Sequence, residues 1–203
     1  MSATKPAAVK PALAHPLNPP RPGADTVQAT LAEWEATAVA VMHDRMHVGV
    51  AHLSQVAGKT GMEVFDAMQA GELPYPPIAE SLDFLLIEAT PGRAVFQGSP
   101  KLRHYNPLGT VHGGWIATLL DSCVGCAVHT LLPAGKTYTT AELKINYVKA
   151  LGEKAKLVRA EGRVIHMGGR MATADGRLYG ADGTLYAHAS TTCFIFDVPA
   201  STS

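Results

Sequence analysis

The 203-residue chain has no excess of charge of either sign, since 17 lysines and arginines balance 17 aspartates and glutamates. A balanced chain provides no broad electrostatic surface for nucleic acid or an anionic membrane. The sequence also lacks an unbroken apolar run of the roughly 20 residues that cross a bilayer, because Asp121 and His129 interrupt the apolar segment 115–132. The N-terminal segment has no apolar signal-peptide core. We therefore expect no nucleic-acid partner, no membrane partner and a cytoplasmic location.

Cysteine is scarce, with three in the whole chain, which excludes a disulfide framework. Cys123 and Cys126 have the C-x-x-C spacing of redox and zinc sites, but the only other cysteine is Cys193, with no histidine pair beside it. A thioredoxin-like motif opens a helix, whereas this pair lies in the middle of an apolar segment. We predict no metal site and interpret the cysteines as helix packing, with a thiol oxidoreductase as the remote alternative.

Two further catalytic motifs are missing. Gly58-Lys59-Thr60 resembles the end of a phosphate-binding P-loop, but Leu53 stands where the first glycine is required. A Gly-x-Ser-x-Gly sequence is absent, which argues against an α/β-hydrolase.

Prolines are concentrated near the N-terminus, where six of the fourteen lie between Pro6 and Pro22. This segment has no hydrophobic period, so residues 1–25 are predicted to be a disordered tail. Residues 26–60 are predicted to form a helical extension, with one helix over 26–48. Residues 61–198 should form the main domain and residues 199–203 a second tail. Met46 is an alternative start, because the main domain begins after it.

The hydrophobic patterns of the main domain predict an α+β fold. After a short helix at 62–70, alternating residues predict strands, with a hairpin at Thr90-Pro91-Gly92. Asp175-Gly176 is interpreted as mid-strand, since a turn there would leave only a short strand after it. An antiparallel sheet wrapped around one central helix accommodates all these elements. The predicted strands are 82–88, 93–97, 139–148, 154–166, 170–179 and 184–196, and the predicted helix is 112–133.

The most informative segment is a His112-Gly113-Gly114 turn that opens onto this apolar helix, which carries a lone carboxylate, Asp121. A helix start offers unpaired N–H groups and a partial positive charge, which suit an oxyanion. A carboxylate on an apolar helix is a candidate general base. Gly113 and Asp121 are separated by roughly 12 Å along a helix, too far to act on one carbonyl. A two-fold dimer with antiparallel helices would bring them together; a salt bridge across an interface would explain Asp121 equally well.

This pattern resembles the PaaI-like branch of the hotdog-fold acyl-CoA thioesterases. The resemblance covers about residues 60–198 and includes Pro76–Ile78, the run Tyr138–Tyr147 and the motif Asn106-Pro107-x-Gly109-x-x-His112-Gly113-Gly114 followed by Asp121. It implies the hotdog fold and hydrolysis of a thioester. Asp121 would be the base or nucleophile, and the backbone N–H after His112, at Gly113 with Gly114 beside it, would polarise the carbonyl. Asn106 and His112 would assist, and Thr140 would help to hold the water.

The resemblance also implies where substrate binds. Gly169 and Arg170 match the place where relatives hold the nucleotide end of coenzyme A, although Arg170 could be an ordinary solvated arginine. Arg103 and Lys136 are vaguer candidates. Trp115 and Thr118 are predicted to contact a small aromatic or medium-chain acyl group. Coenzyme A enters as part of the substrate, and no other cofactor is expected.

Several assignments have plain structural alternatives. His112 could simply cap the helix, and Gly125 could mark helix packing or close approach of a ligand. His129 could touch substrate, whereas His104 is predicted to lie on the loop surface. We expect a homodimer or a homotetramer with shared active sites. A non-catalytic acyl-CoA binding or regulatory protein on the same fold is the alternative function.

Overall fold

The computed structural model describes residues 22–42, 46–152 and 154–198. In this part of the chain six strands form one antiparallel sheet in the order β1-β2-β4-β5-β6-β3. The last element of that order, β3, is therefore an edge strand. The strands are β1 (Phe84–Thr90), β2 (Arg93–Gly98), β3 (Lys136–Tyr147), β4 (Val158–Met167), β5 (Met171–Gly180) and β6 (Leu185–Asp197).

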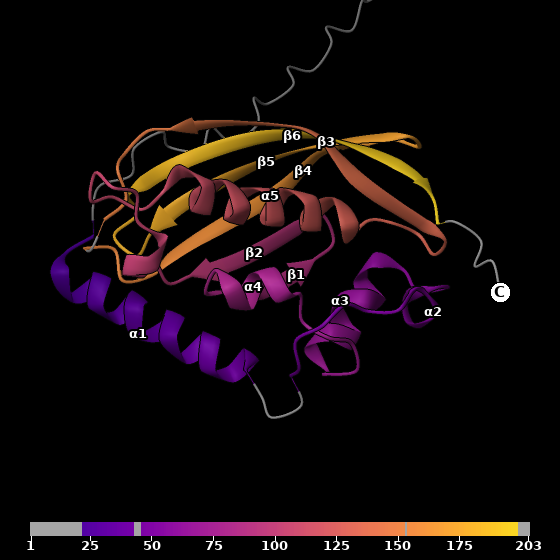
Figure 1. Cartoon of the computed structure of the whole chain (residues 1–203), viewed down its shortest axis with the longest axis horizontal. Coiled ribbons are helices and arrows are strands. Elements are labelled where there is room, and N and C mark those ends of the chain that lie inside the picture. Colours follow the sequence, from indigo (N-terminus) through magenta and orange to yellow (C-terminus); the bar gives the residue numbers. More distant parts are fainter. Residues whose placement is uncertain (1–21, 43–45, 153, 199–203) are drawn as a thin grey trace, which may run out of the picture.

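The long helix α5 (Gly113–His129) lies against one face of the curved sheet, which wraps around it (Figure 1). Leu119, Leu120 and Val124 are completely buried in this contact. The helix backbone approaches β4 so closely at Gly162 that any Cβ there would overlap the backbone of Cys123. This arrangement confirms the predicted α+β hotdog architecture.

Most of the predicted strands are confirmed, with shifted ends. The β1–β2 hairpin turns at Gly92, whose φ of 77° needs glycine, and β5 runs through Asp175 and Gly176 as predicted. The fourth strand starts at Val158 rather than at residue 154, because the chain turns back between Gly152 and Ala155 before it. The central helix ends at His129 rather than near residue 133.

Four helices precede the sheet: α1 (Ala24–Val41), α2 (Leu53–Val56), α3 (Gly61–Gln69) and α4 (Pro77–Ser81). The predicted helix over 26–48 is wrong at both ends. It begins at Ala24, inside the predicted tail, and it stops at Val41 because Met42 has extended backbone angles. Residues 1–21 of the tail predicted over 1–25, and the whole tail predicted over 199–203, lie outside the described residues. A short 3-10 turn, η1 (Leu102–His104), lies between β2 and α5.

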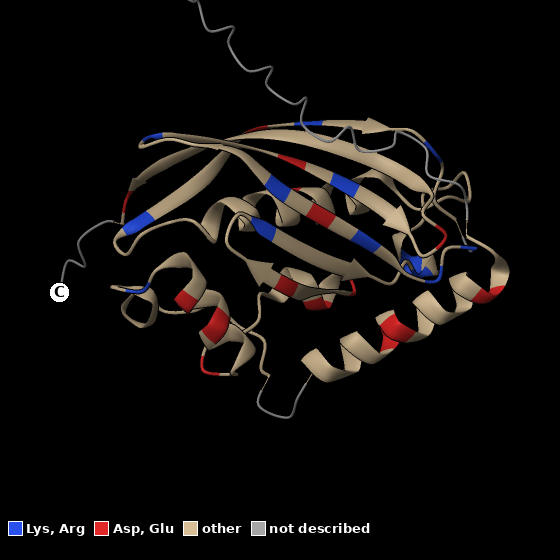
Figure 2. Ribbon diagram, turned by 180° about the vertical axis from the view of Figure 1, so that it is seen from behind, with Lys and Arg blue, Asp and Glu red and all other residues tan. Residues whose placement is uncertain are grey.

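Helix α1 covers part of the sheet face that points away from α5. Trp34 is only 5% exposed, and its ring lies 4.5 Å from the Arg159 guanidinium carbon and 6.0 Å from the Tyr179 ring. The Gln97 amide donates to the Trp34 carbonyl. Such contacts explain why Gln97 is buried although it points outward. Cationic and anionic residues are interspersed along the strands of the sheet (Figure 2).

Helix α3 is attached to the far end of α5. Thr60 caps α3 and forms a capping box with Glu63, and the Gly61 N–H donates to the Leu132 carbonyl at 2.9 Å. A Cβ on Gly61 would overlap the His129 carbonyl, so only glycine allows this approach. Helix α3 is therefore part of the same packed unit as the central helix. Within the described ranges, none of the helices combines the length and apolar character needed to span a membrane.

Candidate active site

A folded loop leads into the start of α5. The Asn106 side-chain oxygen accepts from the Leu108 and Thr110 N–H groups at 2.9 and 3.2 Å, and its amide donates to the Thr110 hydroxyl. Gly109, with φ of 81°, completes the turn. The predicted turn at Asn106 is therefore present. The amide of Asn106 uses both its oxygen and its nitrogen within this loop, so its observed role is to shape the approach to the helix.

The backbone N–H groups at the helix start are not equivalent. His112 is the N-cap, and its Nδ1 accepts from the Gly114 N–H at 2.8 Å. The Gly113 N–H, in contrast, has no hydrogen-bond acceptor among the described residues. The capping interpretation of His112 is thus observed, and it leaves Gly113 as the free donor at the positive end of the helix.

Tyr147, at the end of β3, lies over this helix start. Its hydroxyl donates to the Gly113 carbonyl at 3.0 Å, and its ring would be 3.3 Å from a Cβ added at Gly113. A cavity of about 290 Å³ opens beside both residues, lined mainly by apolar side chains such as Val111, Ile116 and Leu151. In the sequence, Tyr147 stands out only as part of a family motif, because its contact with Gly113 depends on how β3 lies against α5.

Asp121 is exposed on α5, and the Thr140 hydroxyl donates to its carboxylate at 3.1 Å. Two predicted site residues are thereby brought together from the central helix and the edge strand. The hydroxyl uses one acceptor position of the carboxylate, and exposure leaves the other positions accessible to water. Asp121 is consequently placed as a general base or nucleophile would need to be.

Within one protomer, the two halves of the predicted site lie apart. Gly113 and Asp121 both belong to the regular helix α5, which separates them by roughly 12 Å. Both flank the edge strand β3 on the accessible side of the helix, as the contacts to Tyr147 and Thr140 show. One chain therefore presents the Gly113 N–H at one place and the Asp121 carboxylate at another.

Beyond Asp121 the helix surface is covered. A Cβ added at Gly125 would lie 2.8 Å from the Tyr138 hydroxyl oxygen, so this glycine accommodates a tyrosine of the same chain. His129 is half-buried between the rings of Tyr138 and Phe65, at 5.6 and 5.1 Å, and burial lowers its pKa. Sequence spacing identified the helix face but could not show which side chains cover it.

Trp115 lies in the core and does not accompany Asp121. It is 3% exposed, its indole N–H donates to the Leu82 carbonyl at 2.8 Å, and its ring stacks on His104 at 5.4 Å. The surface position predicted for His104 is wrong: its side chain is buried between Trp115 and Asp83. Burial lowers the pKa of His104 although the Asp83 charge opposes this effect.

The remaining predicted contacts lie at two places. Thr118 is half-buried on the Asp121 face, where its hydroxyl donates to the Gly114 carbonyl. Gly169 and Arg170 are exposed in the β4–β5 turn. The register of the sheet places this turn near the end of β5 that pairs with Phe194 and Cys193 of β6, and Cys193 pairs in turn with Thr140. Arg170 is therefore at the Asp121 end of the molecule, away from Gly113 of its own chain.

The cysteines pack inside the protein as interpreted. Cys123 is completely buried and Cys126 half-buried, and both are free thiols. Burial raises the pKa of Cys126 to about 12, which suppresses the thiolate that redox chemistry requires. Across the described ranges, His, Cys, Asp and Glu residues form no group of three or more that could hold a metal.

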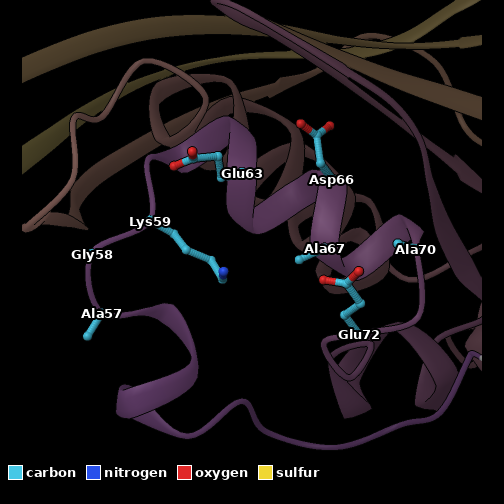
Figure 3. A pocket seen from close by; sticks show the side chains of 8 residues that line it. All are labelled: Ala57, Gly58, Lys59, Glu63, Asp66, Ala67, Ala70 and Glu72. Carbon is cyan, nitrogen blue, oxygen red and sulfur yellow. The ribbon is translucent and has the colours of Figure 1, made fainter.

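A separate hollow of about 490 Å³ lies between α2 and α3, lined by Lys59, Glu63, Asp66 and Glu72 among others (Figure 3). None of the predicted site residues lines it. Glu63 also belongs to the capping box of α3. At least this one of the carboxylates that line the hollow therefore has a structural role.

Comparisons with known proteins agree with this geometry. Residues 108–187 match the family model of the Thioesterase superfamily. The TT0310 protein of Thermus thermophilus is 30% identical, with 58% of this chain and 96% of that chain covered and a TM-score of 0.53. A mutant of the phenylacetic acid degradation protein PaaI from the same organism is 29% identical, with coverage of 58% and 97% and a TM-score of 0.54.

A third solved structure is a phenylacetic acid degradation-related protein from Ralstonia eutropha, 27% identical over 64% of this chain and 98% of that chain, with a TM-score of 0.59. These matches span nearly the whole length of the relatives. They leave a large part of this chain unmatched, in keeping with its additional N-terminal helices. The family model, the sequence identities and the sheet wrapped around α5 together show that the chain belongs to the PaaI-like hotdog branch of the thioesterase superfamily, whose members are thioester hydrolases.

Proposed function

We propose that this thioesterase hydrolyses an acyl-CoA with a small aromatic or medium-chain acyl group, releasing coenzyme A and a carboxylic acid. The observation that carries the proposal is the exposed Asp121 carboxylate, held by the Thr140 hydroxyl at 3.1 Å on the same helix whose first N–H, at Gly113, is free. The names of two relatives refer to phenylacetic acid degradation, which supports an aromatic acyl group.

In this mechanism Asp121 removes a proton from a water molecule as the water oxygen attacks the thioester carbonyl carbon. The carbonyl oxygen gains negative charge and is stabilised by the Gly113 N–H at the helix start. The tetrahedral intermediate then collapses, the carbon–sulfur bond breaks and coenzyme A leaves as a thiolate. A thiolate is a good leaving group, so a strong general acid is not required. The alternative role of Asp121 is direct attack, with hydrolysis of the resulting mixed anhydride by water.

The site is completed by a second copy of the chain. Because roughly 12 Å of helix separates Gly113 from Asp121, the donor and the base that act on one carbonyl come from different protomers. An antiparallel contact between two α5 helices brings each Asp121 to the partner's helix start and generates two equivalent sites. The functional unit is accordingly a homodimer, alone or paired into a tetramer.

The nucleotide end of coenzyme A is proposed to bind near Gly169 and Arg170. Arg170 is exposed and lies at the Asp121 end of the sheet, so it is available to a phosphate of a substrate whose thioester reaches Asp121. This role is confined to affinity, since Arg170 would contact the nucleotide and not the reacting carbonyl.

The test is the rate of thiol release from a panel of acyl-CoAs by the wild type and by Asp121→Asn. The amide is nearly isosteric but cannot accept the proton, so kcat should fall at least about 10²-fold while the Kd of a non-hydrolysable analogue stays nearly unchanged. Asp66→Asn, on the exposed side of α3, is the matched control and should retain full kcat. Full activity of Asp121→Asn would disprove the mechanism.

The second candidate is a non-catalytic acyl-CoA binding protein. The Asp121–Thr140 pair argues against it, because binding alone gives no reason to place a carboxylate beside a thioester. Saturable binding of acyl-CoA without thiol release by the wild type would favour this candidate.

A further inference from the structure

Inward-facing residues of β3 contact successive turns of α5. Side chains alternate along a strand, so Thr140 and Tyr138 both point toward the helix. Thr140 contacts Asp121, and Tyr138 covers Gly125, one turn further along, where a Cβ would lie 2.8 Å from its hydroxyl oxygen. The carboxylate and the aromatic ring are therefore neighbours on one helix face.

Tyr138 is held firmly in this position. Its ring lies 5.6 Å from that of His129, and its hydroxyl oxygen lies against Gly125, 2.8 Å from where a Cβ would be. Burial raises the pKa of Tyr138 well above its ordinary value, which keeps the phenol neutral. Because Gly125 offers no side chain to displace, the ring can lie directly on the helix backbone.

The support behind Tyr138 comes from α3. His129 packs against Phe65 of α3 at 5.1 Å, and Phe65 is 3% exposed. The Gly61 N–H fixes the start of α3 to Leu132. Phe65 and Gly61 lie outside residues 108–187, which match the family model. Tyr138, His129 and Phe65 form an aromatic wall that joins β3, α5 and α3.

The wall limits the space next to the carboxylate. Only one helical turn, roughly 6 Å, separates Asp121 from Gly125. In the antiparallel dimer described under the proposed function, the helix face from Gly113 to Asp121 is opposite the partner helix. An acyl group that extends from the thioester along α5 toward Gly125 therefore reaches Tyr138 within a single helical turn.

We propose that Tyr138, supported by His129 and Phe65, sets the upper size of the acyl group, so that the substrate carries a short chain or a single ring. This inference rests on the proposed thioesterase activity, and it narrows the acyl range given there. A longer chain has no room beyond the first turn unless the ring moves, and moving it breaks its contacts with Gly125 and His129.

The experiment compares kcat/KM for a series of straight-chain acyl-CoAs from butyryl to dodecanoyl in the wild type, Tyr138→Leu and Phe84→Leu. Leucine at position 138 removes the outer part of the aromatic side chain and leaves no polar group in its place. Phe84 is a core aromatic that packs on Phe96, away from the Asp121 face. Its substitution therefore controls for a general loss of core packing. Melting temperatures of all three proteins establish that they are folded.

The wild type should prefer short acyl groups, and Tyr138→Leu should raise the ratio of dodecanoyl to butyryl kcat/KM at least about 10-fold, within the range by which pocket size discriminates substrates. Phe84→Leu should keep the wild-type ratio. A wild type that hydrolyses dodecanoyl-CoA as efficiently as butyryl-CoA would overturn the inference even if Tyr138→Leu failed to fold. So would an unchanged ratio in a folded Tyr138→Leu protein. Absence of hydrolysis across the whole series would instead disprove the proposed function.

Discussion

The Thr140 hydroxyl donates a hydrogen bond of 3.1 Å to the Asp121 carboxylate, linking the edge strand of the sheet to the central helix. This contact fixes the rotamer of the only carboxylate on α5 and uses one of its acceptor positions. The remaining positions face the accessible side of the helix, where a water molecule can bind. We therefore expect Thr140 to position the Asp121 carboxylate, and substitutions of Thr140 can test this role without disturbing the fold.

Replacing Thr140 with valine should reduce kcat about tenfold, because a hydrogen bond to a charged group contributes about 1.5–3 kcal/mol and only part of that is specific to the transition state. Thr140→Ser keeps the hydroxyl and should recover most of the rate. The control is Thr139→Val, on the exposed opposite side of β3, which should behave as wild type. Equal rates for Thr140→Val and wild type would remove Thr140 from the site.

The Gly113 N–H can be deleted without removing the helix. Proline is favoured at the first position of a helix, and His112 has φ −62° and ψ 136°, which suits a residue before proline. Gly113→Pro should therefore fold and lose about 10²–10³-fold in kcat, as expected for loss of an oxyanion donor.

Gly113→Ala is the matched control for that substitution. It meets the same Tyr147 ring at 3.3 Å but retains the N–H, so it should keep most of the activity. If alanine and proline reduce kcat equally, steric contact with Tyr147 explains the loss and the oxyanion role of Gly113 is wrong.

Arg170→Ala should raise KM for acyl-CoA about fivefold and leave kcat unchanged, because one exposed phosphate contact contributes about 1 kcal/mol and is weakened by salt. A short acyl-pantetheine substrate, which lacks the nucleotide, should be unaffected. Arg177→Ala, another exposed arginine of the sheet, provides the comparison. An equal loss with both substrates would mean that Arg170 supports the fold or the acyl site.

Much of the fold could be predicted because its periodicities are strong. Alternation across Ala172, Ala174 and Leu178 identified β5 as one strand through Asp175-Gly176, and the apolar run after His112 identified α5. Element ends were less predictable. Met42 ends α1 through its backbone conformation, and neither glycine nor proline marks that position in the sequence.

The candidate site was predictable in part for a similar reason. Spacing along one helix places Asp121, Gly125 and His129 on a common face, but it does not reveal what covers them. Tyr138 occupies that surface only because β3 pairs with β6 in a register that aligns it with Gly125. His104 was misplaced because its loop folds back under Trp115, a tertiary contact without a local sequence signal.

Complementation in mixed dimers tests most directly whether each site combines Asp121 of one protomer with Gly113 of the other. Asp121→Asn and Gly113→Pro, each inactive alone, are unfolded together and refolded as an equal mixture. Each heterodimer then contains one intact site, so random pairing should restore about one quarter of wild-type activity. Heterodimers that form, as shown by differential tags, but remain as inactive as either parent would contradict a shared site.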